Sequence, residues 1–311
     1  MRVNAARKLG GIRLPRHTYK YRKPQRRKIR PSSVALALLC LLLLTYPFFE
    51  AYHLTVDHHT VLIPSLPASL KNLRIVYASD IRAGARYPQW RVNELVKTIN
   101  SQSADLVLLG GDYADTSDDA ITFFKNLPQI QARLGVLGTV GEADRTPPES
   151  NLALLVKAMT GAGVTPLVNG TARIKVGPAY LHISGADDSV GGQPDVQRLA
   201  ATVRESDCMI FLGHNPDLLT SAIRATGADG DTHWFDLALF GHTHGGQITL
   251  LGLPMLPALI PDSGDRYLRG WLEENRASIL ISNGVGTSWF PARLFAPAQI
   301  HVITLKNKET R

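Results

Sequence analysis

The sequence has very little cysteine and lacks the glycine-rich motif of dinucleotide-binding proteins. Only two of its 311 residues are cysteine. Cys40 lies in an apolar run and Cys208 in the buried-looking stretch CMIFLG, so the two are not expected to pair and no disulfide framework is implied. No GxGxxG follows the first expected strand, which argues against a dinucleotide-binding sheet. The length suits one large catalytic domain with an appendage.

Acidic residues are absent from the first 30 positions, where 12 of the 34 Lys and Arg residues lie. The rest of the chain holds the remaining 22 basic residues and all 26 acidic ones, a net charge of −4. The formal charge of +8 and the pI of about 9.6 therefore describe a basic tail on a mildly acidic body. A basic protein of this pI suggests nucleic-acid binding, but this distribution does not, and we expect no nucleic-acid partner.

Charge is also absent from residues 33–49. At about 1.5 Å per residue, a helix over 33–52 would span roughly the 30 Å of a bilayer core. The stretch FFEAYH offers no small-x-small cleavage site, so an uncleaved anchor is preferred to a signal peptide. The end of the run carries aromatic residues of the kind found at membrane interfaces, namely Tyr46, Phe48, Phe49 and Tyr52.

The excess of basic residues before the anchor predicts that the N-terminus stays in the cytoplasm. The chain would then be a single-pass protein of the cell membrane with its main domain outside the cytoplasm. The expected parts are a basic cytoplasmic tail (1–32), a transmembrane anchor (33–52), a linker with the first strand (53–71) and a catalytic domain (72–307).

Beyond the anchor, strands and helices alternate. Strands are expected at 73–80, 104–112, 134–142, 208–214 and 235–242, with helices at 87–101, 118–127, 148–163, 194–206 and 216–227. Residues 165–188 are expected to form two or three antiparallel strands, with turns at Asn169-Gly170 and Gly177-Pro178. The last strands fall at 247–252, 277–285 and 298–306. This mixture predicts an α/β (α+β) fold with two sheets packed face to face and helices outside.

Several apolar strands are followed by a residue that binds metals. Side chains at the carboxyl ends of neighbouring strands converge on one crevice, so these residues are expected to meet. A mixture of carboxylates and imidazoles suits Mn, Fe or Zn. The candidate ligands are Asp80, Asp112, Glu142, His214, His242 and His244.

These blocks resemble the calcineurin-like metallophosphoesterases, and most closely their membrane-associated bacterial branch, whose last motif reads GHTHGGQ. The resemblance covers about residues 72–306 and is most specific in GHTHGGQITLLG and SNGVGTSWFPARLFAPAQIHVITL. It implies a four-layer αββα sandwich and metal-dependent hydrolysis of phosphodiester, pyrophosphate or phosphomonoester bonds. That branch includes enzymes that act on lipid-linked substrates, so a phosphorylated, lipid-linked substrate at the membrane is the leading candidate.

The resemblance assigns roles to the candidate ligands. Asp112 of the intact second motif would bridge two metals. The first metal would be held by Asp80, Asp112 and His244. The second would be held by Asp112, His214 and His242, with Glu142 in place of an asparagine.

Two motifs depart from the family pattern. The first motif is D-x-H in the family, but here Arg82 stands at the histidine position. The third motif reads Gly141-Glu142-Ala143-Asp144, so Ala143 replaces the histidine that contacts the scissile phosphate. Arg82 cannot ligate a metal, because it stays protonated and has no acceptor. One metal ion is therefore expected in preference to two.

The altered residues leave several roles open. Arg82 would pair with Asp80, Asp112 or Glu142, and the two charge changes together suit an Arg82–Glu142 pair. Arg82, as a phosphate clamp, and Asp144, which would orient the missing histidine, are the candidate catalytic residues. The leading hypothesis is an enzyme with an altered, single-metal site. The alternatives are a degenerate relative that binds a phosphorylated ligand or an envelope partner, and a purely structural module.

Three smaller expectations concern residues outside these motifs. The glycine-rich residues 184–192 are expected to form a loop near the substrate. His58 and His59 are expected in a solvated stretch just past the anchor. Arg293 lies in a loop near the last motif, where a solvated surface position is expected.

Overall fold

The computed structural model describes residues 30–147 and 151–308, so residues 1–29 of the expected tail (1–32) lie outside the described residues. The chain divides into two compact units, Met1–Leu42 and Leu43–Arg311. Helix α1 (Pro31–Tyr52) covers the expected anchor. Among the described residues it is the one helix long and apolar enough to cross a membrane, a test that a signal sequence also passes.

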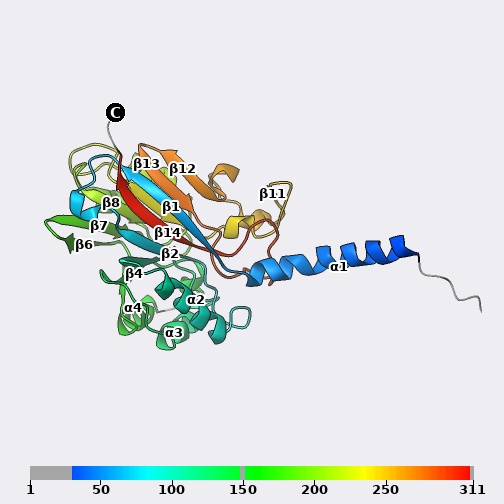
Figure 1. Cartoon of the computed structure of the whole chain (residues 1–311). Helices are drawn as coiled ribbons and strands as arrows, with labels where there is room; N and C mark the ends of the chain where they lie inside the picture. Colours follow the sequence, from blue (N-terminus) through cyan, green and yellow to red (C-terminus); the bar gives the residue numbers. More distant parts are fainter. Residues whose placement is uncertain (1–29, 148–150, 309–311) are drawn as a thin grey trace, which may run out of the picture. The chain divides into compact units, whose positions relative to one another are not determined.

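The second unit holds two six-stranded sheets (Figure 1). In the first sheet β2, β3, β4 and β5 run parallel, while β14 is antiparallel to β2 and parallel to β1. The order across this sheet is β1 (Thr55–Ile63), β14 (Gln299–Asn307), β2 (Arg74–Ala78), β3 (Leu106–Leu109), β4 (Val136–Gly138) and β5 (Val164–Pro166).

The second sheet has a parallel centre and antiparallel edges. Strands β13, β9, β8 and β7 run parallel, and β12 and β6 close the two edges in antiparallel hairpins. Its order is β12 (Gly270–Glu274), β13 (Ala277–Ile281), β9 (Leu237–Phe240), β8 (Cys208–Leu212), β7 (Ala179–Gly185) and β6 (Gly170–Val176). A small hairpin pairs β10 (Thr249–Leu250) with β11 (Leu253–Pro254).

The alternation of side chains along the strands builds three layers of core. Because successive residues of a strand face opposite sides, Ile75 and Tyr77 of β2 pack between the sheets, whereas Val76 and Ala78 face outward. The inter-sheet core is completed by residues of the second sheet such as Leu239 of β9. The outer face of each sheet is also apolar, so each needs helices to cover it.

Helices cover both outer faces. The first sheet is covered by α2 (Gln89–Ser101), α3 (Ser117–Lys125) and α4 (Leu152–Gly161), which lie together in Figure 1. The second is covered by α5 (Val196–Ala200) and α6 (Leu218–Arg224). The αββα sandwich predicted from the sequence is therefore the fold. Short 3-10 helices add Ala68–Leu70, Ala143–Arg145, His244–Gly246, Pro257–Leu259 and Asp265–Tyr267.

Local signals explain where two helices begin. The Thr116 side chain caps α3 by accepting a hydrogen bond from the Asp119 amide at 3.2 Å. Asn151 caps α4 in the same way, accepting from the Ala153 amide at 3.0 Å. Such side-chain acceptors satisfy donors that the first helical turn leaves free. The expected helix at 148–163 thus begins at Leu152, and residues 148–150 lie outside the described part of the chain.

The first strand expected within 53–71 is β1, and it pairs with β14 over its whole length as an edge of the first sheet. Two other segments differ from the sequence-based expectations. In the 165–188 region only β6 and β7 are antiparallel, because β5 joins the first sheet parallel to β4. His59 is not simply solvated, since its ring stacks on Trp271 at a centroid distance of 4.0 Å, while His58 is exposed.

Candidate metal centre

The predicted ligands follow the carboxyl ends of strands that lie side by side. Asp80 follows β2, Asp112 follows β3 and Glu142 follows β4 of the first sheet. His214 follows β8, while His242 and His244 follow β9 of the second sheet. The two groups of parallel strands thus deliver their ends to one place, as parallel sheets do in general.

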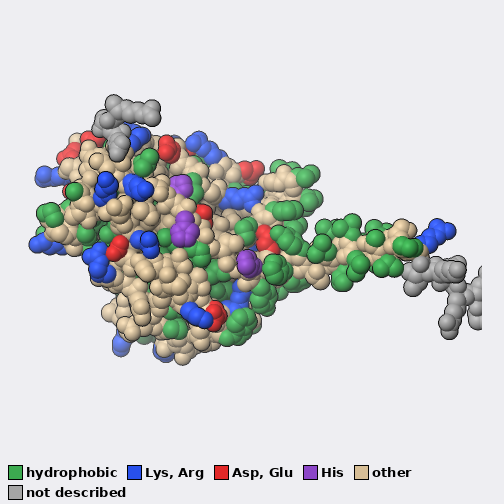
Figure 2. Space-filling model, viewed as in Figure 1, with side chains coloured by type: hydrophobic (Ala, Val, Ile, Leu, Met, Phe, Trp, Pro, Cys, Tyr) green, Lys and Arg blue, Asp and Glu red, His purple; other side chains and the backbone are tan. Residues whose placement is uncertain are grey.

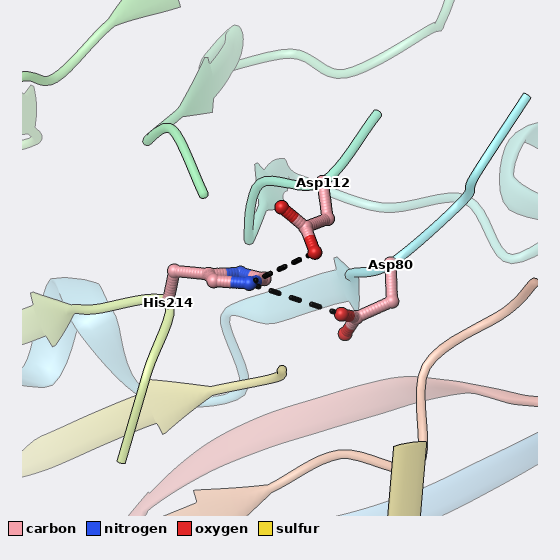
Figure 3. A group of neighbouring side chains, drawn as sticks. All are labelled: Asp80, Asp112 and His214. Carbon is pink, nitrogen blue, oxygen red and sulfur yellow. Dashed lines mark ion pairs between the residues drawn. The ribbon is translucent and has the colours of Figure 1, made fainter. Parts of the chain in front are cut away.

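A triad of Asp80, Asp112 and His214 forms the centre of the site (Figure 3). The Nε2 atom of His214 lies 3.2 Å from Asp112 Oδ2 and 4.0 Å from Asp80 Oδ1. All three side chains are fully buried. One ligand atom from each lies within 4.8 Å of the others, a spacing suited to one metal ion.

The other three predicted ligands surround this triad. His244 Nε2 lies 3.7 Å from Asp80 Oδ1. The rings of His242 and His214 are 5.4 Å apart between centroids, and His242 Nδ1 lies 4.0 Å from a Glu142 carboxylate oxygen. All six predicted ligands are therefore linked to the same centre, with Glu142 at its exposed edge.

The imidazole nitrogens have the arrangement that a metal requires. His214 Nδ1 lies 2.8 Å from the Gly110 carbonyl oxygen, so this nitrogen donates and Nε2 faces the carboxylates. His242 Nδ1 and His244 Nε2 are buried and have no hydrogen-bond partner among the described residues. Buried polar atoms are rarely left without a partner. These unpartnered nitrogens, next to two carboxylates, fit a bound divalent cation.

The backbone at the site is held in an unusual conformation. Four of the candidate ligands and Arg82 have positive φ, namely Asp80 (53°), Asp112 (56°), His242 (69°), His244 (49°) and Arg82 (51°). Only glycine adopts this left-handed region readily, and other residues there cost about 1–3 kcal/mol each. Such strain concentrates at functional sites, where surrounding contacts hold it.

Two glycines allow the close packing of these residues. A Cβ on Gly141 would lie 2.8 Å from His214 Cδ2 and would also collide with Asp112 Oδ1. A Cβ on Gly284, which has a φ of 69°, would lie 2.6 Å from the Asp80 Cβ. No larger residue fits at either position without moving a ligand.

Arg82 pairs with the central carboxylate. Its Nη2 atom donates to Asp112 Oδ2, and its Nη1 lies 3.8 Å from Asp115. Of the three partners considered from the sequence, the structure selects Asp112. Glu142 instead has its nearest cationic or imidazole partner in His242. Arg82 therefore places positive charge against the carboxylate that bridges two metals in the family pattern.

The charges around Asp112 set the ionisation of the centre. Burial alone would raise the pKa of Asp112, but Arg82 and His214 outweigh it and hold that pKa far below its usual range. Burial likewise opposes charge on His214, yet Asp112 and Asp80 hold its pKa well above the ordinary value. Burial lowers the pKa of His242 and of His244, and the nearby Arg293 charge lowers the pKa of His244 further. Both imidazoles are therefore neutral and offer a lone pair.

Asp144, predicted as catalytic, lies buried behind the ligands. Its carboxylate accepts hydrogen bonds from the backbone amides of Asp112 (2.8 Å), Tyr113 (3.0 Å) and Gly141 (2.9 Å). Burial, with the charge of Asp112, raises the pKa of Asp144 to about 7. The contacts indicate that Asp144 fixes the backbone carrying Asp112, and they involve no group that would meet a substrate.

Sequence reasoning missed two buried residues near the ligands. Arg293, expected at the surface, is fully buried and donates to the carbonyls of Gly286, Ala296 and His244, at 3.0, 2.8 and 3.2 Å. Burial raises the pKa of Asp188 to about 6, although the charge of His214 acts in the opposite direction. The glycine-rich stretch 184–192 indicated a loop near the site but did not single out Asp188.

A cleft of about 130 Å³ opens beside the ligands. Typical small-molecule pockets hold about 300–1,000 Å³, so this cleft admits only a small group of a larger substrate. Its lining combines the site residues with apolar side chains at the rim, namely Arg82, Asp115, Glu142, Ala143, Thr146, His242, Leu259, Ser288 and Trp289.

Comparison with known proteins gives the site its context. No family model matches the chain. It is 27% identical over 265 residues to an uncharacterised metallophosphoesterase, YkuE, of Bacillus subtilis, covering 84% of this chain and 88% of that protein. It is 27% identical over 238 residues to phosphodiesterase YaeI of Escherichia coli, covering 75% and 82%.

A third relative comes from an animal. The chain is 29% identical over 206 residues to a Bos taurus transmembrane protein with a metallophosphoesterase domain. The match covers 61% of this chain and 44% of the bovine protein. The relatives from Bacillus subtilis and Bos taurus are both named for metallophosphoesterases, and the one from Escherichia coli is named a phosphodiesterase. The chain is therefore similar in sequence to metallophosphoesterases and to a phosphodiesterase.

Proposed function

We propose that this protein is a membrane-anchored, metal-dependent phosphoesterase that hydrolyses phosphodiester bonds, with pyrophosphate or phosphomonoester bonds as further candidates. The observation that carries the proposal is the convergence of two buried carboxylates and three imidazoles at the ends of parallel strands. Phosphodiesterase YaeI supports the choice of bond by its name.

The residues of the centre would hold one divalent cation, for which Mn, Fe and Zn are the candidates. Asp80, Asp112 and His214 would be the main ligands of this cation, and His242 and Glu142 lie close enough to add further ligand atoms. The metal would supply positive charge to polarise the phosphoryl group and activate water. A second ion is disfavoured because the Arg82 guanidinium already pairs with Asp112 and would repel it.

Arg82 would bind the phosphoryl group. Its guanidinium lines the cleft, and its Nε has no hydrogen-bond partner among the described residues. Arginine recognises phosphate through two parallel N–H donors, so Arg82 can orient the group against the metal ligands. Asp112 would stay ionised throughout, because the Ala143 amide donates to its Oδ1 at 2.8 Å while Arg82 donates to Oδ2.

The anchor would bring the domain to its substrate. Helix α1 is long enough to cross a bilayer, and the bovine relative is named as a transmembrane protein. Tethering raises the local concentration of substrates in the same membrane. We therefore propose a phosphorylated, lipid-linked substrate, no nucleic-acid partner, a cytoplasmic N-terminus and an extracytoplasmic domain.

Two features favour an alternative in which the domain binds a phosphorylated ligand without turnover. Arg82 forms an ion pair with the Asp112 carboxylate. Ala143, which lines the cleft, has no polar side chain at the position where the family has a histidine. A group in that role contributes typically ~100- to 10,000-fold in rate. The alternative differs from the main proposal in turnover and agrees with it in metal binding.

The test measures metal and turnover on the purified full chain in detergent. Bound Mn²⁺ is counted by elemental analysis, and hydrolysis of bis-p-nitrophenyl phosphate is followed for the parent, His242→Ala and His58→Ala. We expect about one metal per chain. His242→Ala should lose activity by at least ~100-fold, since removing a group that only hydrogen-bonds to a metal ligand already lowers metal affinity or activity by about 10- to 100-fold. His58 is exposed on β1, so its variant should match the parent. Metal without turnover favours the binding alternative, and a chain with neither contradicts the proposal.

A further inference from the structure

Two neighbouring loops expose large apolar side chains beside the cleft. One is the hairpin β10–β11, and the other covers residues 288–295. Leu251 at the tip of the hairpin is 92% exposed, and the others are between about half and two thirds exposed. Figure 2 shows the apolar side chains gathered over the β11 hairpin. We call this set the apolar rim: Leu250, Leu251, Leu253, Met255, Trp289, Phe290 and Phe295.

The backbone under the apolar rim is fixed by hydrogen bonds. The two loops are joined where the Thr249 amide donates to the Leu294 carbonyl and the Leu294 amide donates to the Gln247 carbonyl, each at 2.9 Å. Buried Gln247 also donates from Nε2 to the carbonyls of Ser288 and Phe290, each at 2.9 Å. The two loops that expose the apolar side chains are thus held in place by hydrogen bonds.

The apolar rim is continuous with the last turns of α1. The Arg293 amide donates to the Pro47 carbonyl at 2.9 Å, and the rings of Phe48 and Phe290 meet edge to face at 5.6 Å. Buried Glu50 accepts the amides of Phe295 (3.1 Å) and Ala296 (2.8 Å). These contacts all lie within the unit Leu43–Arg311.

The exposed aromatic residues of that helix end extend the same surface. Phe49 and Tyr52 are 65% and 52% exposed. Exposed apolar patches that are contiguous mark interaction sites. Aromatic and leucine side chains beside an unburied apolar helix have the composition of a membrane interface. Arg269, which donates to the Phe295 carbonyl, adds positive charge at this edge, where anionic headgroups would lie.

We propose that the apolar rim inserts into the interface of the bilayer that α1 enters, so that the domain rests on the lipid surface. Ser288 and Trp289 line the cleft, and Trp289 also belongs to the apolar rim, so the cleft opens next to the lipid. This inference rests on the membrane anchoring proposed above and is independent of whether the site turns over.

The test places a fluorescent label on the full chain in phosphatidylcholine–phosphatidylglycerol vesicles. The background carries Cys40→Ala and Cys208→Ala, and the label is attached at Leu251→Cys or at Leu154→Cys. Leu154 is the control, because it is 53% exposed on α4 and outside the apolar rim. Lipids carrying a nitroxide on the acyl chain should quench the label at 251 at least ~2-fold more than the label at 154, as burial below the headgroups requires.

A second label separates the anchor from the docking surface. With Cys208→Ala alone, the native Cys40 carries the label and reports whether α1 is inserted. Quenching at 40 with equal, weak quenching at 251 and 154 overturns the docking surface while the anchor stands. Absence of quenching at 40 overturns both. A label at 251 that is shielded from lipid quenchers, but changes with protein density in the vesicle, would mean that a second copy of the chain covers the apolar rim, which also overturns the proposal.

Discussion

At the scale of single residues, we propose that Arg82 limits the number of metal ions that the site can hold. Arg82→His removes the guanidinium from Asp112 and supplies an imidazole instead, so we expect the bound metal to rise from about one toward about two per chain. Elemental analysis of the purified full chain in Mn²⁺ measures this. Arg86→His is the matched control, because Arg86 pairs with Asp115 at 2.5 Å. Equal metal content in the two variants would show that another feature limits the second ion.

A residue far from the site predicts a pH dependence of stability. The carboxylate of Asp236, just before β9, accepts the Met209 amide at 3.0 Å, and burial raises its pKa to about 6. Between pH 4 and 6 the folded protein keeps a proton that the unfolded chain releases. The free energy of unfolding therefore falls as pH rises through this window, by up to roughly 3 kcal/mol from this group.

The variant Asp236→Asn lacks this titration while keeping an acceptor for the Met209 amide. Relative to the parent, it should gain stability as pH rises from 4 to 6, by up to roughly 3 kcal/mol. Urea unfolding at both pH values measures the difference, with Asp229→Asn, at an exposed position, as the control. A difference between parent and variant that does not change with pH would contradict the raised pKa.

The sequence predicted which candidate ligands lie close together, because residue type and position at a strand end are both visible in one chain. It did not predict burial that depends on distant segments. Arg293 lies in a polar-looking loop, yet its guanidinium is fully buried among carbonyls that come from three different segments. The positive φ of Asp80 and Asp112 is likewise imposed by packing between the sheets, which local propensity does not report.

At the scale of elements, the strands and helices of the αββα core were predicted because their periodicity is strong. The exceptions are segments whose partner lies far away in sequence. Strand β1 was expected as a strand, but its sequence does not indicate its partner β14, which begins 236 residues after the end of β1. Strand β5 has only three residues and takes its direction from β4. Tertiary pairing of this kind overrides local signals.

The junction of α1 with the domain depends on one buried carboxylate. Glu50→Ala would leave the amides of Phe295 and Ala296 without acceptors, which costs about 1–3 kcal/mol for each buried group. We expect these two amides to exchange with deuterium at least ~10-fold faster, which corresponds to the lower end of that range. Hydrogen exchange of the full chain measures this, and Glu94→Ala on the exposed face of α2 is the control.

Rapid exchange confined to the 289–297 loop would locate the effect at this junction. If the amides of Phe295 and Ala296 exchange as slowly in Glu50→Ala as in the parent, the helix end does not hold the loop. In that case the connection of the apolar rim to α1 would rest on the Arg293–Pro47 hydrogen bond and the contact between the Phe48 and Phe290 rings.

At the scale of the whole molecule, the chain separates its charges and its chemistry along its length. Twelve basic residues precede the apolar helix, and a domain of net negative charge follows it. The candidate metal ligands come from both sheets, so they meet only when the two sheets pack together. The end of α1 and the C-terminal loops meet within the unit Leu43–Arg311.

This charge separation predicts the orientation of the protein in the membrane. Lys and Arg residues that flank an apolar helix stay in the cytoplasm, so the domain should face outward. In the background Cys40→Ala with Cys208→Ala, a membrane-impermeant maleimide applied to intact cells should label Leu154→Cys on α4. It should label Ala6→Cys in the tail only after the membrane is permeabilised. Both cysteines must react in detergent for the comparison to count.

The tail itself provides the decisive control for this orientation. Replacing its lysines and arginines by glutamine removes the retention signal, and a mixture of orientations should result, with both cysteines partly labelled in intact cells. A parent protein labelled at Ala6→Cys and protected at Leu154→Cys would reverse the topology. A cytoplasmic domain would still be able to rest on lipid through the apolar rim, but its substrates would then come from the inner leaflet.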